Sequence, residues 1–310
     1  KAFQLAMNIL TTIRSSSRNI FCIADFIAAL ISISPKSITV FEYILDYIFD
    51  PSPSKNVFLD KIPLMTFLVA IVDRGLLTEE DLYQRIKAYP PNNDQTYGLF
   101  FCFFCNIIAK FDRSLHQKML QGLQQSIENP FFPDDFRVFM KNYGNLTKNN
   151  YRLHHKCVRL KSYMDPLKCL LAADAFQEIK AMVEDESIAS TTRLETDIFE
   201  PLAYLHNHPP IILACVFFQS IQCFQYLQIH HPDILIRDRK FLRFPQYAIA
   251  GGCQMLIDQI RLPFVEYDGS LQACTLFHRN AQFHQIFRRS KQSLSRPNKQ
   301  NETVMNISVA

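Results

Sequence analysis

Two cysteines at the spacing C-x-x-C are the clearest candidates in this chain for metal binding or thiol–disulfide chemistry. Cys102 and Cys105 lie inside the apolar run Phe100–Ile108, and the sequence holds no second C-x-x-C and no H-x-x-x-H. A structural zinc site needs four ligands. We therefore predict that both cysteines are core residues and that the chain holds no metal.

Histidines form three close pairs that also need weighing as metal ligands: His154–His155, His206-x-His208 and His230–His231. No carboxylate or cysteine stands at a useful spacing from any pair. All three fall in segments that read as turns, where a histidine is usually solvated. We predict solvent-exposed turn residues without a metal.

The short motifs of catalytic and nucleotide-binding sites are missing from the sequence. It contains no G-x-x-x-x-G-K-[ST], G-x-G-x-x-G, G-x-S-x-G or H-E-x-x-H. Gly251-Gly252 alone is typical of a turn between two helices. We therefore expect no catalytic residue, no cofactor, no small-molecule substrate and no enzymatic activity.

The residues that do show a pattern are apolar and recur at a spacing of 33. This shift relates Gln219 to Gly252, Cys223 to Leu256, Phe224 to Ile257, and Leu227 to Ile260. Small residues precede both copies, Ala214-Cys215 in one and Ala248-Ile-Ala250 in the other. A period of 33 is that of ankyrin repeats, in which each unit is a turn and two antiparallel helices. The recurrence predicts that Phe224, Leu227, Ile257 and Ile260 are buried between helix pairs.

Two further copies extend this array, with altered spacing. One lies upstream at Pro166–Asp174, offset by 45 with a polar insertion around Glu184–Thr196, and one downstream at Ser270–Asn280, offset by 27. Gln219 and Arg279 then stand where ankyrin units have turn glycines, which supply a positive φ at low cost.

These segments resemble the degenerate ankyrin-repeat proteins expanded in parasitic protists, and their associated conserved domain of unknown function. The matching residues are Pro209-Pro210, Phe217–Leu227, Ala248–Gly252 and Phe277–Asn280. The resemblance covers about residues 164–287. It implies a helix-hairpin solenoid that binds other proteins, and it names no ligand.

The rest of the chain predicts an all-α protein in three parts. Residues 1–160 form a helical block that begins inside a helix, so we expect it to be N-terminally truncated; residues 161–287 hold the repeats; residues 288–310 form a disordered basic tail. The block has helical periodicity over Ala2–Ile13, Ile20–Ile33, Lys36–Phe49, Val57–Val72, Thr78–Ala88, Tyr97–Phe111, Ser114–Ile127 and Pro133–Asn142. Tyr143–Tyr163 is polar and basic and is predicted to be the junction.

Composition points to a protein of the cytoplasm. The nine cysteines are odd in number and scattered through apolar runs, Cys22 among them, which is typical of buried free thiols in a reducing compartment. The longest apolar runs, Ile20–Ile33 and Leu99–Ala109, are shorter than the roughly 20 residues that cross a bilayer.

The net charge of +4 arises in the tail, where five basic residues accompany one acid. The remainder is neutral, which argues against a globally basic surface for nucleic acid. An electrostatic tether stays open as an alternative, in which the tail and Lys148–Lys161 bind nucleic acid or an anionic membrane surface.

The leading hypothesis is a non-catalytic scaffold that binds protein partners through its repeat surface. Stacked repeats present turns and first helices as a concave face. The candidate contact residues are His206–His208, His230–Asp233, Arg237–Lys240 and Arg261. Partner identity and oligomeric state do not follow from the sequence.

Overall fold

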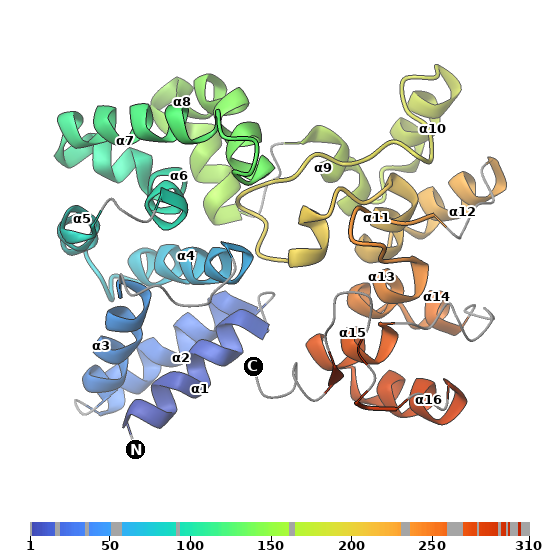
Figure 1. The fold of residues 1–310 in the computed structure, drawn as a ribbon, viewed down its shortest axis with the longest axis horizontal. Helices are drawn as coiled ribbons and strands as arrows, with labels where there is room; N and C mark the ends of the chain where they lie inside the picture. The colour runs from blue at the N-terminus through green and yellow to red at the C-terminus, as the bar shows by residue number, and fades with distance from the viewer. Residues whose placement is uncertain are drawn as a thin grey trace. The chain divides into compact units, whose positions relative to one another are not determined.

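The computed structural model describes residues 2–304 apart from 16–18, 35–36, 51–57, 91–93, 161–164, 231–235, 259–268, 278, 291–292, 296 and 298–302. This part of the chain forms sixteen α-helices and no β-strand (Figure 1). The prediction of an all-α protein is thus confirmed for the described residues.

The helices belong to two compact units. Unit 1 comprises residues 1–164 together with the segment Asp197–Ala203, and unit 2 comprises Asp165–Thr196 and Tyr204–Ala310. The chain therefore passes from unit 2 into unit 1 and back directly after the predicted insertion Glu184–Thr196 and before the repeat copy that begins at Pro210.

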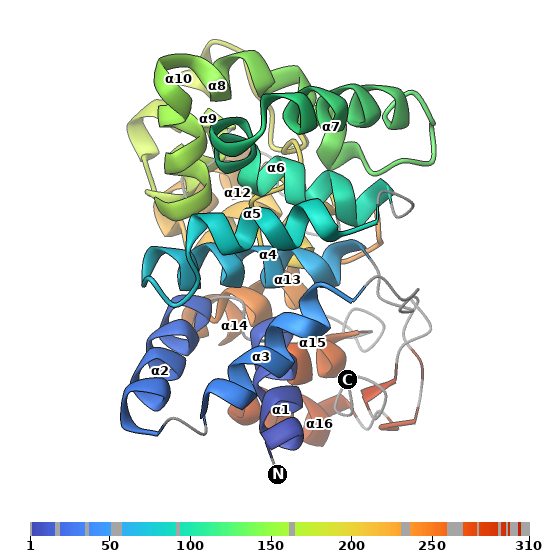
Figure 2. The ribbon, with the colours of Figure 1, turned by 90° about the vertical axis from the view of Figure 1, so that its left-hand side faces the viewer.

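Unit 1 is a succession of eight helices, from α1 at the bottom of Figure 2 to α7 and α8 at its top. Local signals set several of their ends. The Thr78 hydroxyl caps the helix that begins at Glu79, where it accepts the Asp81 amide at 3.0 Å. The Asp112 carboxylate caps the helix that begins at Arg113, where it accepts the Leu115 amide at 2.9 Å. The helices are α1 (Ala2–Ser15), α2 (Ile20–Ile33), α3 (Ser37–Ile48), α4 (Phe58–Asp73), α5 (Glu79–Ala88), α6 (Asp94–Phe111), α7 (Arg113–Ser126) and α8 (Asp134–Leu160).

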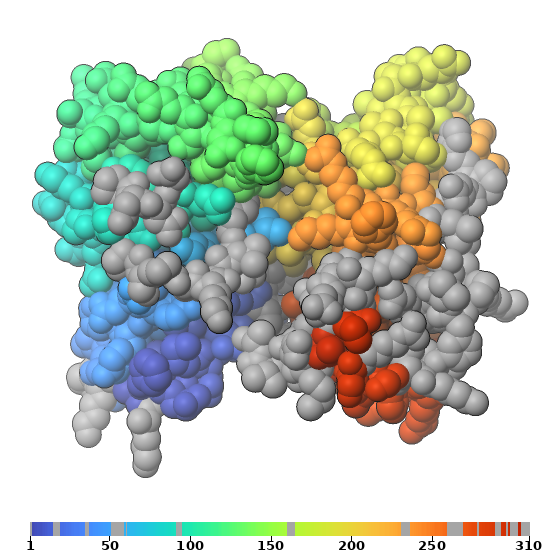
Figure 3. Space-filling model, in the orientation of Figure 1, coloured from blue at the N-terminus to red at the C-terminus, as the bar shows by residue number. Residues whose placement is uncertain are grey.

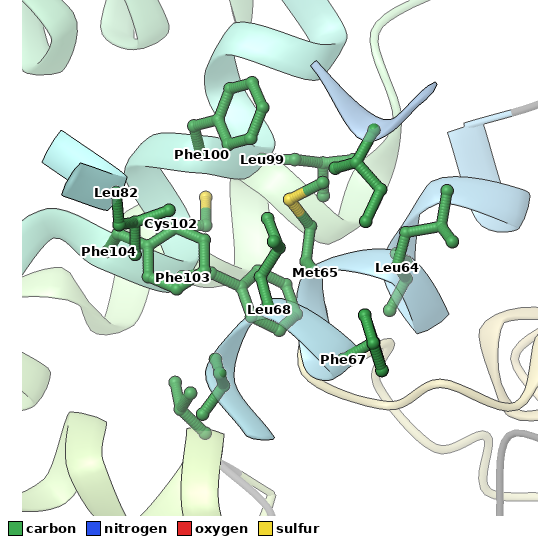
Figure 4. Close-up of a cluster of buried hydrophobic side chains, with 14 of the residues drawn as sticks. Leu64, Met65, Phe67, Leu68, Leu82, Leu99, Phe100, Cys102, Phe103 and Phe104 are labelled. Carbon is green, nitrogen blue, oxygen red and sulfur yellow. The ribbon is translucent and has the colours of Figure 1, made fainter. Parts of the chain in front are cut away.

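The core of unit 1 forms around α4 and α6. Helix α4 contacts α1, α2, α6 and α8, and its residues 62–71 are buried without a break. A helix that is apolar on all sides must lie inside a bundle. Figure 4 shows Leu64, Met65, Phe67 and Leu68 of α4 beside Leu99, Phe100, Phe103 and Phe104 of α6.

Helix α8 corrects the prediction that Tyr143–Tyr163 is a junction. The helix continues to Leu160, and Leu146, His154, Cys157 and Val158 are buried on it. It is interrupted at Lys148, after which Asn149, Asn150 and Tyr151 adopt left-handed backbone angles, with φ of 51°, 56° and 61°. Such angles cost roughly 1–2 kcal/mol per L-residue, least for Asn. The prediction was wrong because the segment is mostly polar, and its few apolar residues do not show from the composition that one side faces the core.

The segment Asp197–Ala203 fills part of the unit 1 core. Ile198 and Phe199 are buried, and the Phe199 ring packs edge-on against Phe103, Phe139 and His154 at centroid distances of 5.3, 6.0 and 5.5 Å. No helical or alternating pattern predicts this contact, because a single aromatic residue in an extended segment carries no periodicity.

Unit 2 is an array of four helix pairs. The first helices α9, α11, α13 and α15 follow one another in Figure 1, and α10, α12, α14 and α16 form a second column to their right. Each first helix contacts the next one and its own partner. The pairs are α9 (Pro166–Ala172) with α10 (Phe176–Glu184), α11 (Ile211–Phe218) with α12 (Ile221–His230), α13 (Phe244–Gly251) with α14 (Gln254–Asp258), and α15 (Ser270–Leu276) with α16 (Asn280–Ser290).

The turns inside the first three pairs repeat one conformation. Asp174, Gln219 and Gly252 are left-handed, with φ of 48°, 63° and 81°. Gln219 thus takes the turn-glycine place as predicted. Arg279 does not take this place. Its amide donates to the carbonyl five residues earlier in the chain, and the amides of Ala175 and Ser220 do the same. Ala175 and Ser220 each come directly after the left-handed residue of their turn. Arg279 is therefore one position beyond the glycine place.

Close backbone approach explains the small residues between α11 and α13. A Cβ atom on Gly251 would lie 2.6 Å from the Phe217 carbonyl oxygen. Side chains from both neighbouring pairs then bond the last carbonyls of α13: Gln219 Nε2 donates to Gly251 O at 2.9 Å, and Arg279 Nε donates to Ile249 O at 3.2 Å. These bonds satisfy carbonyls that a helix C-terminus leaves unpaired.

The first pair is joined to the second in a similar way. The Asp174 carboxylate accepts the backbone amides of Gln222 and Cys223 at 3.3 and 3.1 Å, at the start of α12. The Ser220 hydroxyl donates to the Leu171 carbonyl. An acid at a helix N-terminus satisfies free amides and interacts favourably with the helix dipole.

The residues that recur at a spacing of 33 are buried where they are described. Phe224, Leu227 and Ile257 are 1%, 0% and 6% exposed, which confirms their prediction, and residues 210–227 form helices rather than a strand. Ile260 lies outside the described residues.

Candidate functional site

The C-x-x-C pair lies in the apolar core of unit 1. Cys102 and Cys105 are both fully buried, Cys102 among Leu82, Phe103 and Phe104 in Figure 4. Burial raises the pKa of both thiols, which suppresses the thiolate that a metal ligand or nucleophile requires. Within the described residues, no group of three or more His, Cys, Asp or Glu is placed to hold a metal ion.

One cysteine differs from its prediction. Seven of the nine are buried and Cys169 is half-buried, but Cys22 is exposed on α2. Its neighbours in sequence are apolar, yet Cys22 stands on the side of α2 opposite the buried residues Ile20, Ala24 and Ile27.

A thiol reagent should therefore modify one cysteine rapidly in the native protein. We expect Cys22 to account for the fast phase, because the buried thiols are inaccessible and have raised pKa values; burial raises that of Cys274 to about 12. Ellman's assay on the native chain and on Cys22→Ser checks this. Fast modification of Cys102 or Cys105, or zinc that is lost on changing either to serine, would contradict it.

The histidine predictions are wrong for His154, His155 and His206; His155 is a half-buried residue of α8. His154 lies within α8 and is 1% exposed, with Nε2 2.7 Å from the Cys102 carbonyl oxygen. Burial lowers its pKa to about 4, so it is neutral at neutral pH. His206, at the end of a 3₁₀ helix (Ala203–His206), is also buried. His230 is exposed at the end of α12, and His231 lies outside the described residues.

The predicted contact residues of unit 2 likewise include both buried and exposed positions. Asn207 and Asp238 are buried and Arg237 is half-buried, whereas Arg239 and Lys240 are exposed. Residues 231–233 and Arg261 are not among those described. The first helices were expected to form the binding face, but every residue of α13, and α11 as far as Phe217, is buried. Most exposed residues in the described part of unit 2 therefore lie in its loops and second helices.

The tip of the loop before α13 is the most unusual of these exposed places. Phe241 is 59% exposed and has a left-handed backbone, with φ of 65°, directly after Arg239 and Lys240. A bulky residue at such a φ is strained, and strained residues cluster at functional sites. Side chains of the orange part of the chain reach the surface of unit 2 in Figure 3.

A buried carboxylate holds this tip in place. Asp238 accepts the backbone amides of Lys240 and Leu242, both at 2.8 Å, and its other oxygen lies 2.9 Å from the Tyr247 hydroxyl. Burial raises the pKa of Asp238, and these hydrogen bonds oppose the rise. Because Tyr247 is a fully buried residue of α13, the turn is anchored to the helix array.

A second set of bonds ties the tip to the preceding loop. The Arg193 guanidinium donates to the carbonyls of His208 and Arg237, both at 2.9 Å, and the Arg239 amide donates to the Asn207 carbonyl at 3.1 Å. Loops held in this way lose little conformational entropy on binding. The tip thus exposes the Phe241 ring directly after two exposed cationic residues in the chain.

Phe241 was missed from the sequence, although Arg237–Lys240 beside it was named. Its place in the run Lys240-Phe-Leu-Arg-Phe244 looks like that of a core residue. The available signal was the cluster of charges before it, which is typical of a turn whose next residue is exposed.

None of the helices in the described part of the chain is both long enough and apolar enough to cross a membrane. A scan against protein-family models, a search of curated proteins and a search of solved structures each give no match to this chain.

Proposed function

We propose that unit 2 is a degenerate ankyrin-like repeat array that binds a protein partner through the tip Arg237–Phe241. The stacked helix pairs, the spacing of 33 and the recurring left-handed turn support the ankyrin-like interpretation. An array of this kind offers a rigid surface that carries no fixed chemistry, so its loops determine what it binds.

The exposed, strained Phe241 is the observation that carries this proposal. Aromatic and arginine side chains dominate the binding energy of protein interfaces. Here one ring stands beside Arg239 and Lys240. The complementary partner has an apolar pocket rimmed by carboxylates, since opposite charges steer association and exclude wrong partners.

Site-specific photo-crosslinking tests the proposal with little change in shape. Phe241 is replaced by benzoyl-phenylalanine in the full chain, and Ile229, a 78%-exposed residue of α12, carries the same group as control. We expect the crosslinking group at position 241 to capture one protein from a cell extract, and the same group at position 229 not to capture it. Arg239→Glu with Lys240→Glu should abolish this capture, and circular dichroism should remain unchanged.

The opposite results are equally clear. Equal capture from positions 229 and 241, or capture that survives both charge reversals, would overturn the proposal. A crosslinked product that nuclease removes would favour the electrostatic tether instead. The described residues correct part of that alternative: Arg288 and Arg289, predicted to lie in a disordered tail, belong to α16, and α8 uses part of Lys148–Lys161 to pack the core. The other basic residues of the tail lie outside the described residues.

A further inference from the structure

Unit 1 contains a polar cavity that takes no part in the protein binding proposed for unit 2. Its volume is about 670 Å³, and residues of α5, α6, α7 and α8 line it. Sites for small organic ligands commonly have volumes of roughly 300–1,000 Å³. The lining is rich in basic and hydrogen-bonding side chains, which include Asn106, Lys110, Arg113, His116, Tyr151 and His155.

The permanent charges around the cavity are positive in sum. Lys110 and Arg113 contribute two cations, and Glu79 contributes one carboxylate, whose Oε2 lies 2.7 Å from Lys110 Nζ. Arg113 also stands in the first turn of α7, where the helix dipole is positive. The Asp112 carboxylate already caps this helix end, so the attraction for an anion comes from the Lys110 and Arg113 side chains and not from the helix dipole.

The left-handed turn of α8 forms one wall of the cavity. Asn150 and Tyr151, both with positive φ, line the cavity. The turn brings the Tyr151 hydroxyl to 3.4 Å from His116 Nε2, and the Tyr143 hydroxyl lies 2.9 Å from the same atom. Burial lowers the pKa of His116. The strained backbone thus shapes the wall and fixes an aromatic ring at it.

An unpaired buried nitrogen lines a second, smaller cavity that shares Asn106, Ile107 and His155 with the first. Its volume is about 20 Å³. His154 lines it and is 1% exposed, and its Nδ1 atom has no hydrogen-bond partner. Since Nε2 donates to the Cys102 carbonyl, Nδ1 of the neutral ring is an acceptor. A buried acceptor of this kind requires a donor, from a ligand or from a water that a ligand orders.

We propose that the larger cavity binds a small organic molecule that carries an oxyanion group, either a phosphate or a carboxylate. This group lies between Arg113 and Lys110. Arginine and lysine supply charge-assisted hydrogen bonds to such groups. The body of the molecule lies along Tyr151, and a hydroxyl or amino group, directly or through a water, donates toward His154. This ligand belongs to unit 1 and is independent of the protein-binding tip of unit 2.

A tryptophan reporter gives a direct test, because the chain contains no tryptophan. Gln117→Trp places one indole at the cavity, and Gln124→Trp places one on an exposed part of α7 that does not line it. Phenyl phosphate and benzoate are titrated as the two oxyanion probes, with benzyl alcohol as the neutral probe. We expect a saturable fluorescence change from the indole at position 117 with at least one anion and none with benzyl alcohol.

Charge variants in the reporter background locate the anion. Arg113→Gln should weaken the affinity about tenfold, whereas Lys118→Gln, an exposed lysine of α7 outside the lining, should change it less than twofold. Ala109→Phe, which fills part of the cavity, should abolish the response while circular dichroism stays unchanged.

Several outcomes would overturn the proposal. These are no saturable response to either anion, an equal response to benzyl alcohol, the same response from the indole at position 124, or equal weakening by Arg113→Gln and Lys118→Gln. If Ala109→Phe fails to fold, the comparison of Arg113→Gln with Lys118→Gln alone decides whether the proposal stands. Both of these side chains are exposed, so neither change removes a buried contact.

Discussion

Replacing Phe224 by alanine is expected to lower the free energy of unfolding of unit 2 by about 3–5 kcal/mol. The ring is 1% exposed and lies 5.5 Å, centroid to centroid, from Phe244 of the next helix pair. Its removal loses the burial of the ring and leaves a cavity between two helix pairs that can collapse only in part. The neighbouring Gln225→Ala, at an exposed position of α12, should change the stability by less than about 0.5 kcal/mol.

Buried cysteines allow this measurement within one unit. Cys215 and Cys223 lie in unit 2, and each becomes reactive only when the structure around it opens. Thiol labelling in increasing urea, read by mass spectrometry of proteolytic peptides, gives the opening free energy at both sites. Labelling midpoints in Phe224→Ala that match those of Gln225→Ala would show that Phe224 contributes no packing between the pairs.

Phe199→Ala should produce a loss of similar size, about 3–5 kcal/mol, in unit 1. Phe199 is buried among Phe103, Phe139 and His154, although its segment is flanked in sequence by unit 2 on both sides. We expect the labelling midpoints of Cys102 and Cys105 to move to lower urea. This result would show that the seven residues Asp197–Ala203 are part of the unit 1 core.

The matched control is Phe199→Leu, which keeps most of the side-chain volume and should lose less than half as much stability. Cys102 and Cys105 labelling that is the same in Phe199→Ala and in the unchanged chain would contradict the assignment of this segment to unit 1.

The sequence alone determined most of the helices, because their information is local. Periodicity located α1 to α7 to within a few residues, and Thr78 marked the start of α5. The same reasoning placed Phe224, Leu227 and Ile257 in contact surfaces and Gln219 at a left-handed turn. A helix face and a turn residue are properties of ten or fewer neighbouring residues, and a repeat doubles the signal.

Only the tertiary structure decided where polar or isolated residues lie. His154 is buried with its Nε2 beside the Cys102 carbonyl of another helix, Asp238 is buried where it accepts from the Tyr247 hydroxyl of α13, and the left-handed turn at Tyr151 lies within the interrupted helix α8. Phe199 enters the core of unit 1 without any periodic pattern, and Phe241 is exposed although its residue type is typical of a core. The cavity of unit 1 is lined by residues that are far apart in the chain, and the tip of unit 2 is held by Arg193 and Asn207, which lie about 30 or more residues before it. Their chemistry depends on long-range contacts, which residue type and spacing do not encode locally.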